Sequence, residues 1–233
     1  MEVCPEGVRK VGTPLNGNDG CILCGKCALA CPANALELAG RSVTVEEVLE
    51  EALKDRIFYE QSGGGITFSG GEPLMQGQFL LSALEACGKE GLHRAVDTTG
   101  YADSELLLKV ARETDLFLYD LKHMDSDLHR EFTGVPNELI LENLRLLAQT
   151  GASIQIRIPV ISGINTDKEN MNHTAEFIVS VGLNCVSLLP YHGAAKRKYE
   201  RLGLSYPLSD LQPPSDAEMN LFAESLGRRH INV

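Results

Sequence analysis

The residues with the clearest chemistry are cysteines near the amino terminus. They are Cys21, Cys24, Cys27 and Cys31, separated by two, two and three residues, and Pro32 follows the last of them. Thiolates at this spacing, ending in Cys-Pro, typically hold a [4Fe–4S] cluster. Paired C-x2-C elements also bind zinc, but the third evenly spaced cysteine and the Cys-Pro ending favour an iron–sulfur site.

An earlier Cys-Pro pair, Cys4 and Pro5, leaves two ways of forming the cluster. In two-cluster ferredoxins the fourth cysteine of each run binds the cluster held by the first three of the other run. On this pattern Cys4 completes a cluster with the first three cysteines of the later run, and Cys31 belongs to a second cluster whose other ligands are not among the printed residues. Alternatively, the later run holds a single cluster and Cys4 is incidental. Because of Pro5 we favour the crossed arrangement.

A second set of functional side chains follows the strand-like segments of the chain. A lone Gly-Gly is more often a turn, and a lone strand histidine is more often a satisfied buried group. Here several such features coincide, and they describe a pocket with two carboxylates, two cations and an imidazole, suited to a zwitterionic ligand. The first three segments end in Ser69-Gly70-Gly71-Glu72-Pro73, Asp97-Thr98-Thr99-Gly100 and Asp120-Leu121-Lys122. The fourth carries Arg157 before Pro159, and the fifth continues into Pro190-Tyr191-His192.

These side chains must be positioned by alternating strands and helices. The strands are expected at 64–69, 93–97, 116–121, 153–160 and 185–189, with a strand-like stretch at 33–45 and a further strand beginning at 230–233. The helices are expected at 45–54, 78–89, 104–112, 138–149, 168–181 and 216–228, the first opened by a capping box of Thr44 and Glu47. Strict alternation predicts an α/β fold with a parallel sheet, either an incomplete TIM-like barrel or a doubly wound sheet. The carboxyl ends of the strands then form the active face.

Composition narrows the class of protein. The chain has 233 residues, a formal net charge of −11, 43% hydrophobic and 23% charged residues, which is typical of a globular protein and excludes disordered and coiled-coil chains. Its acidic balance argues against nucleic-acid binding, and no apolar run is long enough for a membrane span. Without a secretory signal we expect a cytoplasmic protein, whose crowded cysteines serve metal or redox chemistry rather than disulfides. Cys87 and Cys185 are expected to be core residues.

The segment from Tyr59 to Pro73, YEQSGGGITFSGGEP, closely resembles the signature of glycyl-radical-enzyme activating enzymes, which are radical S-adenosylmethionine (SAM) enzymes. The likeness continues through Asp97–Gly100, Asp120–Lys122, Arg157–Val160 and Leu189–His192. The ferredoxin-type cysteines match the subset of this family with additional clusters. The resemblance implies a partial TIM-like (β/α) barrel over residues 41–233 and an incomplete ferredoxin-like [4Fe–4S] module over residues 1–40.

The resemblance also implies a role for each strand-end residue. The backbone around Gly70, Gly71 and Glu72 would hold the amino group of SAM. Lys122 and Arg157 would meet carboxylate and ribose groups, and His192 the adenosyl portion. The methionyl end would lie near Asp97, Thr98 and Asp120, with a monovalent cation as a further candidate. The family reduces SAM by one electron, and the resulting 5′-deoxyadenosyl radical removes hydrogen from a glycine of a partner enzyme. A flavodoxin or a ferredoxin-like protein would donate the electron, and we expect a monomer.

One departure from the family concerns catalysis itself. The family places a C-x3-C-x2-C loop, which binds the SAM-cleaving cluster, after its first barrel strand, and the printed residues contain no such loop. We therefore predict an amino-terminally truncated form that lacks the first strand and cannot cleave SAM as given. The alternatives are a non-catalytic iron–sulfur electron-transfer or binding remnant and a radical SAM enzyme with another substrate, although the signature at Tyr59–Pro73 argues against the latter.

Overall fold

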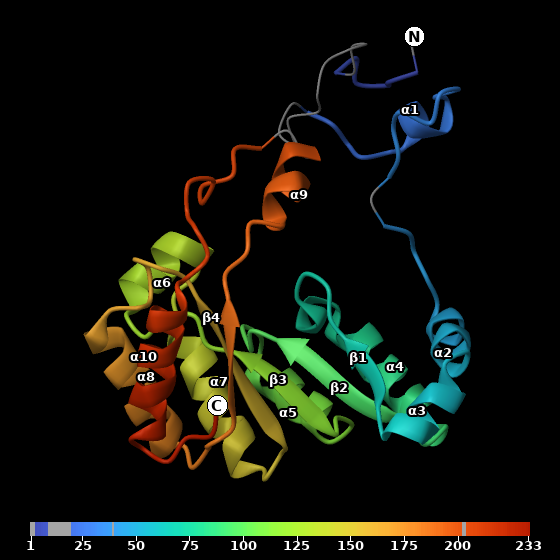
Figure 1. Cartoon of the computed structure of the whole chain (residues 1–233). Coiled ribbons are helices and arrows are strands. Elements are labelled where there is room, and N and C mark those ends of the chain that lie inside the picture. Colours follow the sequence, from blue (N-terminus) through green and yellow to red (C-terminus); the bar gives the residue numbers. More distant parts are fainter. Residues whose placement is uncertain (1–2, 9–19, 39, 202–203) are drawn as a thin grey trace. The chain divides into compact units, whose positions relative to one another are not determined.

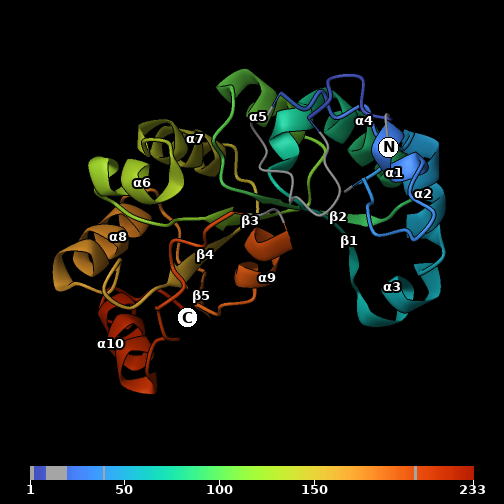
Figure 2. The same ribbon diagram turned by 90° about the horizontal axis from the view of Figure 1, so that it is seen from above.

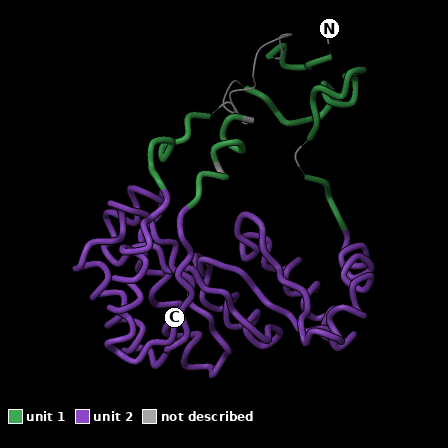
Figure 3. Tube along the Cα trace, viewed as in Figure 1, with its two compact units in different colours: residues 1–43, 192–212 green, residues 44–191, 213–233 purple. Residues whose placement is uncertain are grey.

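The computed structural model describes residues 3–8, 20–38, 40–201 and 204–233. The chain divides into two compact units, shown in Figure 3. Unit 1 comprises residues 1–43 and 192–212, and unit 2 comprises residues 44–191 and 213–233. The predicted ferredoxin-like module therefore falls within unit 1, together with a later segment of the chain, and the predicted barrel residues up to 191 fall mainly within unit 2.

Unit 2 contains a sheet of five parallel strands, seen as arrows in Figure 1. Its order, β1-β2-β3-β4-β5, follows the sequence. A doubly wound sheet reverses its strand order at a switch point, so the sequential order identifies the barrel-type alternative. Beyond β5, Asn232 forms a single parallel bridge with Cys185, where a further strand was predicted to begin. The strands are β1 (Gly65–Phe68), β2 (His93–Thr98), β3 (Leu116–Asp120), β4 (Ile154–Val160) and β5 (Val186–Pro190).

The predicted helices are confirmed to within one residue at each end. The capping box of Thr44 and Glu47 is present at the start of α2. These helices are α2 (Val45–Leu53), α4 (Gly77–Lys89), α5 (Ser104–Ala111), α7 (Glu138–Gln149), α8 (Lys168–Ser180) and α10 (Asp216–Gly227). Short helices that the sequence did not predict are α1 (Lys26–Leu29), α3 (Arg56–Ser62), η1 (Pro73–Gln76), α6 (Ser126–Thr133) and α9 (Ala195–Arg201).

The strand-like stretch predicted at 33–45 is wrong for its described part. Pro32 and Ala33 form a turn, and the next residue, Asn34, has a positive φ of 48°. A left-handed residue interrupts an extended run, and the described residues from 34 to 44 contain no strand.

The core of unit 2 lies between the sheet and the helices on one of its sides. Along β4 the side chains alternate, so that Ile154, Ile156, Ile158 and Val160 are buried and Arg157 faces the opposite side. This two-residue period is the expected one for a strand with two different faces. Figure 2 shows α4, α5, α7 and α8 along the covered side of the curved sheet. Asp97 of β2, Asp120 of β3 and Arg157 of β4 therefore project from the other side.

The two later cysteines differ in their surroundings. Cys87 is fully buried with Ala52 and Leu92, as predicted, and burial raises the pKa of its thiol. Cys185 was also predicted to be in the core, but it is exposed. Its Sγ donates to Oε1 of Gln155 at 2.6 Å. Cys185 has the same parity as the outward-facing residues of β5, which explains why a position at the start of a strand does not bury it.

Candidate functional site

The first element of the site is the glycine turn that follows β1. Gly70 has a φ of +133°, a conformation that side-chain-bearing residues rarely adopt. A Cβ atom built on Gly70 or Gly71 would meet no described atom within 4 Å. The backbone of this turn is therefore open to close approach, and the binding of a ligand by these two glycines stays a prediction.

Glu72 ties the β1 turn to the β2 turn through its carboxylate. Oε1 accepts from Oγ1 of Thr98 at 2.6 Å and from the backbone N–H of Leu74 at 3.1 Å. Oε2 accepts from the backbone N–H and Oγ1 of Thr99, at 2.9 and 2.6 Å. Thr98 is buried, and its Oγ1 also accepts from Gly100 N at 2.9 Å. The side chains of Glu72 and Thr98 thus join two turns, and their predicted roles toward SAM stay predictions.

Buried side chains contact the backbone of the turn after β2, at Gly100 and Ala102. Gly100 has a φ of +72°, and a Cβ there would lie 1.7 Å from Oη of Tyr119. That Oη donates to the carbonyl of Ile140 at 2.7 Å, and burial, followed by the charge of Glu72, raises the pKa of the phenol. Nδ2 of Asn143 donates to the carbonyls of Gly100 and Ala102 at 2.7 and 2.8 Å. A side chain at position 100 would therefore require Tyr119 or the turn itself to shift.

A chain of charged side chains runs across the carboxyl ends of β2, β3 and β4. The guanidinium of Arg157 bonds Oδ1 of Asp97, and its Nη2 and Nε donate to Oδ1 of Asp120 at 2.8 and 3.1 Å. Nζ of Lys122 donates to Oδ2 of Asp120 at 3.1 Å. Oγ of Ser69 donates to Oδ2 of Asp97 at 2.8 Å, which joins the β1 turn to the network. Asp120 and Arg157 are paired residues in the register of β3 and β4.

The four charged side chains of this network, two acids and two bases, balance in formal charge. Their exposed fractions are 20% for Asp97, 19% for Asp120, 22% for Arg157 and 32% for Lys122. Such partial burial strengthens the ion pairs relative to those at the surface, while leaving each group accessible to a ligand. A zwitterion placed here can exchange its own charges for those of the network. The structure thus brings Asp97, Asp120, Lys122 and Arg157 together at the strand ends, and their binding of a ligand stays a prediction.

The remaining predicted residues belong to unit 1. His192 is exposed and directly follows Tyr191, the last residue of the first segment of unit 2. The candidate cluster ligands are partly buried or exposed, and Gly25 between them has the positive φ of 72° expected of a turn. Within the described ranges, no three His, Cys, Asp or Glu side chains are arranged to hold a metal ion. Cluster binding by Cys4, Cys21, Cys24, Cys27 and Cys31 stays a prediction from their spacing.

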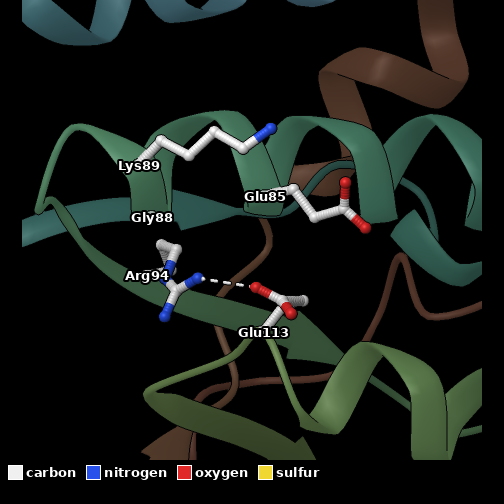
Figure 4. Close-up of a pocket in the computed structure, with 5 residues that line it drawn as sticks. All are labelled: Glu85, Gly88, Lys89, Arg94 and Glu113. Atoms are coloured by element: carbon white, nitrogen blue, oxygen red, sulfur yellow. Dashed lines mark hydrogen bonds and ion pairs between the residues drawn. The ribbon is translucent and has the colours of Figure 1, made fainter.

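The hollow in Figure 4 lies at the opposite, amino-terminal end of the strands. It is lined by Glu85, Gly88, Lys89, Arg94 and Glu113, and Arg94 pairs with Glu113 at 3.2 Å. Arg94 also binds Asp115 through Nε at 3.0 Å. This hydrogen bond raises the pKa of the guanidinium, so the group stays charged. In a parallel barrel such ion pairs at the amino end are structural. Substitutions in this hollow are therefore suitable controls for substitutions at the carboxyl ends of the strands.

Several groups at the strand ends were not predicted. The sequence predicted no role for Ser69, and it predicted neither burial nor a role for three asparagines, Asn137, Asn165 and Asn170. Their carboxamides bond backbone atoms of the turn after β3. A polar residue in a loop or at the start of a helix carries no sequence signal of burial, so only the tertiary structure identifies these asparagines.

The chain is similar to known proteins in sequence and in fold. The family model described as Radical SAM superfamily matches residues 22–178. The chain belongs to the radical SAM superfamily. Within it, the chain belongs to the glycyl-radical-enzyme activating enzymes, as the motifs at Tyr59–Pro73 and beyond predicted.

Three relatives illustrate the relationship of this radical SAM chain. It is 46% identical to the trans-4-hydroxy-L-proline dehydratase activating enzyme of Clostridioides difficile over 80% of the chain and 63% of that relative. It is 40% identical to the choline trimethylamine-lyase activating enzyme of Oleidesulfovibrio alaskensis over 94% of the chain and 74% of that relative. It is 35% identical to the pyruvate formate-lyase 2-activating enzyme of Escherichia coli over 91% of the chain and 74% of that relative.

Solved structures confirm the radical SAM fold. A domain of a pyruvate-formate lyase-activating enzyme from Bacteroides vulgatus is 40% identical, with a TM-score of 0.62 over 72% of this chain and 96% of that one. A radical SAM methyltransferase from Sphaerobacter thermophilus, at 19% identity, shares the fold with a TM-score of 0.61 over 91% of this chain and 60% of that one. The described helices include none long and apolar enough to cross a membrane.

Proposed function

We propose that this chain is part of an enzyme that activates a glycyl radical enzyme by reductive cleavage of SAM. The reaction would give a 5′-deoxyadenosyl radical, which takes a hydrogen atom from a glycine of the partner protein. The proposal is supported by relatives whose names describe activators of dehydratases and lyases, of which this chain spans 63% to 74% of the length. The partner is a protein with a glycine that can carry a radical.

The observation that carries the proposal is the network Asp97–Arg157–Asp120–Lys122 beside the open glycine turn. In the SAM complex, Lys122 and Arg157 would pair with the carboxylate and ribose oxygens of SAM. Backbone carbonyls of Gly70 and Gly71 would accept from its amino group. The two aspartates would then hold the two cationic side chains in place at the strand ends. Asp97 bonds Arg157, and Asp120 bonds both Arg157 and Lys122. A monovalent cation and His192 stay predicted additions to this site.

The iron–sulfur part of the proposal depends on the spacing of the thiols. The donor set of Cys4, Cys21, Cys24 and Cys27 has the chemistry of a [4Fe–4S] site, but the described thiols do not lie in a metal-holding group. A [4Fe–4S] cluster supplies single electrons when it is bound. The electron donor, flavodoxin or ferredoxin-like, stays a prediction. The 233 printed residues contain no C-x3-C-x2-C loop, and we expect a polypeptide of these residues to form no deoxyadenosine from SAM.

The proposed SAM site is tested by equilibrium dialysis of radiolabelled SAM against three forms of the chain. Wild type should bind, and Lys122→Ala should bind at least about tenfold more weakly, since a hydrogen bond to a charged group contributes about 1.5–3 kcal/mol. Lys89→Ala removes the same chemical group from the hollow at the other end of the strands and should bind as wild type does. Equal affinities for wild type and Lys122→Ala would refute the site.

A further inference from the structure

Three buried asparagines from separate elements bond the backbone of Lys122, His123 and Met124, the turn after β3. Asn137 lies at the start of α7, Asn165 in the loop before α8, and Asn170 in the first turn of α8. All are at most 5% exposed. A carboxamide that is removed from water needs several hydrogen-bond partners. Each of these asparagines therefore restrains the backbone atoms that it bonds.

Asn165 connects the turn after β3 to strand β4. Its Nδ2 donates to the carbonyl of Lys122 at 3.0 Å and to that of Pro159 at 2.6 Å, and its Oδ1 accepts from Ile161 N at 2.9 Å. Pro159 is two residues beyond Arg157 on β4. One side chain therefore fixes the backbone that carries Lys122 relative to the strand that carries Arg157.

The other two asparagines hold the rest of the turn. Nδ2 of Asn137 donates to the carbonyls of His123 and Met124, at 3.0 and 2.8 Å. Oδ1 of Asn170 accepts from Met124 N at 2.9 Å, and its Nδ2 donates to the carbonyl of Asn165 at 3.0 Å. Asn170 thus supports Asn165 directly, so that the three amides act together on one turn.

We propose that Asn165 is a positioning residue that sets the reach of Lys122 toward SAM, with Asn170 supporting it. A lysine side chain is flexible, so the place where its ammonium group is delivered depends on how firmly its own backbone is held. With the carbonyl of Lys122 released, the ammonium group is no longer confined to the position at which it meets Asp120. This inference rests on the proposed SAM site.

The test measures the environment of the Lys122 side-chain amine. Lysines are reductively methylated with 13C-formaldehyde, and the chemical shifts of the 13C-methyl groups are measured by NMR. The methyl signal of Lys122 is assigned by its loss in Lys122→Arg. In Asn165→Ala that signal should move toward the signals of exposed lysines, and in Asn170→Ala it should move less in the same direction. Asn143→Ala is the matched control, because Asn143 is equally buried and also donates to two carbonyls, but in the β2 turn. Its Lys122 signal should stay in place.

SAM affinity supplies the second readout. Asn165→Ala should weaken binding about tenfold in the wild-type background, and should cause no further loss when Lys122 is already alanine. Losses that add in the double variant, or an unmoved Lys122 signal in folded Asn165→Ala and Asn170→Ala, would overturn the proposal. Failure of wild type to bind SAM would refute the proposed function instead, and the methyl signal would still decide whether Asn165 positions Lys122.

Discussion

Replacing Glu72 by glutamine should destabilise the protein, because its carboxylate holds two turns together. The four hydrogen bonds to its oxygens come from Leu74 N, Thr98 Oγ1, Thr99 N and Thr99 Oγ1. In glutamine one oxygen becomes an amide NH2 group, which cannot accept from the backbone N–H or from the threonine hydroxyl that it faces. Bonds to a charged acceptor contribute about 1.5–3 kcal/mol each. Since the half-buried side chain can relax, we expect a total loss of about 3 kcal/mol.

This loss is measurable by thermal unfolding followed by circular dichroism. For a domain of this size, about 3 kcal/mol lowers Tm by roughly 6–12 °C. Glu85→Gln is the control, because Glu85 is exposed in the hollow of Figure 4 and should change Tm little. A Tm for Glu72→Gln within about 2 °C of wild type would refute the role of Glu72 as a tie between the turns.

Other substitutions test the turns, a buried histidine and the cysteines. Gly100→Ala should lower stability by about 2 kcal/mol or more in urea denaturation, because of its positive φ and the approach of Tyr119; an unchanged midpoint would contradict this. Burial lowers the pKa of His129, so the unfolded chain takes up its proton at higher pH. The free energy of unfolding should fall as pH drops below about 6.5, and His129→Gln should lose part of that dependence in denaturation series at several pH values. An equal slope in both proteins would be the opposing result. If the crossed arrangement holds, reconstituted Cys4→Ser should lose bound iron while Cys31→Ser keeps it, as measured by iron analysis; the reverse pattern would favour a single cluster held by the later run.

The sheet and its main helices were predictable because their signals are local. Alternation along β4 and the apolar spacing of α4 follow directly from strand and helix periodicity. The short helix α3 was missed because Ile57 and Phe58 are 65% and 66% exposed, so its apolar side chains do not mark a buried face. Helix α6 has a capping aspartate, Asp125, but buries only His129, which leaves little periodic signal.

At the site, the sequence predicted which residues meet better than it predicted their hydrogen bonds and ion pairs. Asp97, Asp120, Lys122 and Arg157 do meet at the strand ends, because parallel strands bring their carboxyl ends to one edge. That Arg157 bonds both aspartates depends on the register of neighbouring strands, which no single segment encodes. The bonds of Glu72 to the β2 turn likewise join residues 26 and 27 positions apart.

The most direct measurement of the central claim is a crystal structure of the chain soaked with SAM under anaerobic conditions. The methionyl carboxylate should lie within hydrogen-bonding distance of Lys122 or Arg157, and the amino group should face the backbone of Gly70 and Gly71. Ordered SAM at the amino-terminal end of the strands, near Arg94 and Glu113, or elsewhere away from the β1–β4 strand ends, would contradict the assignment.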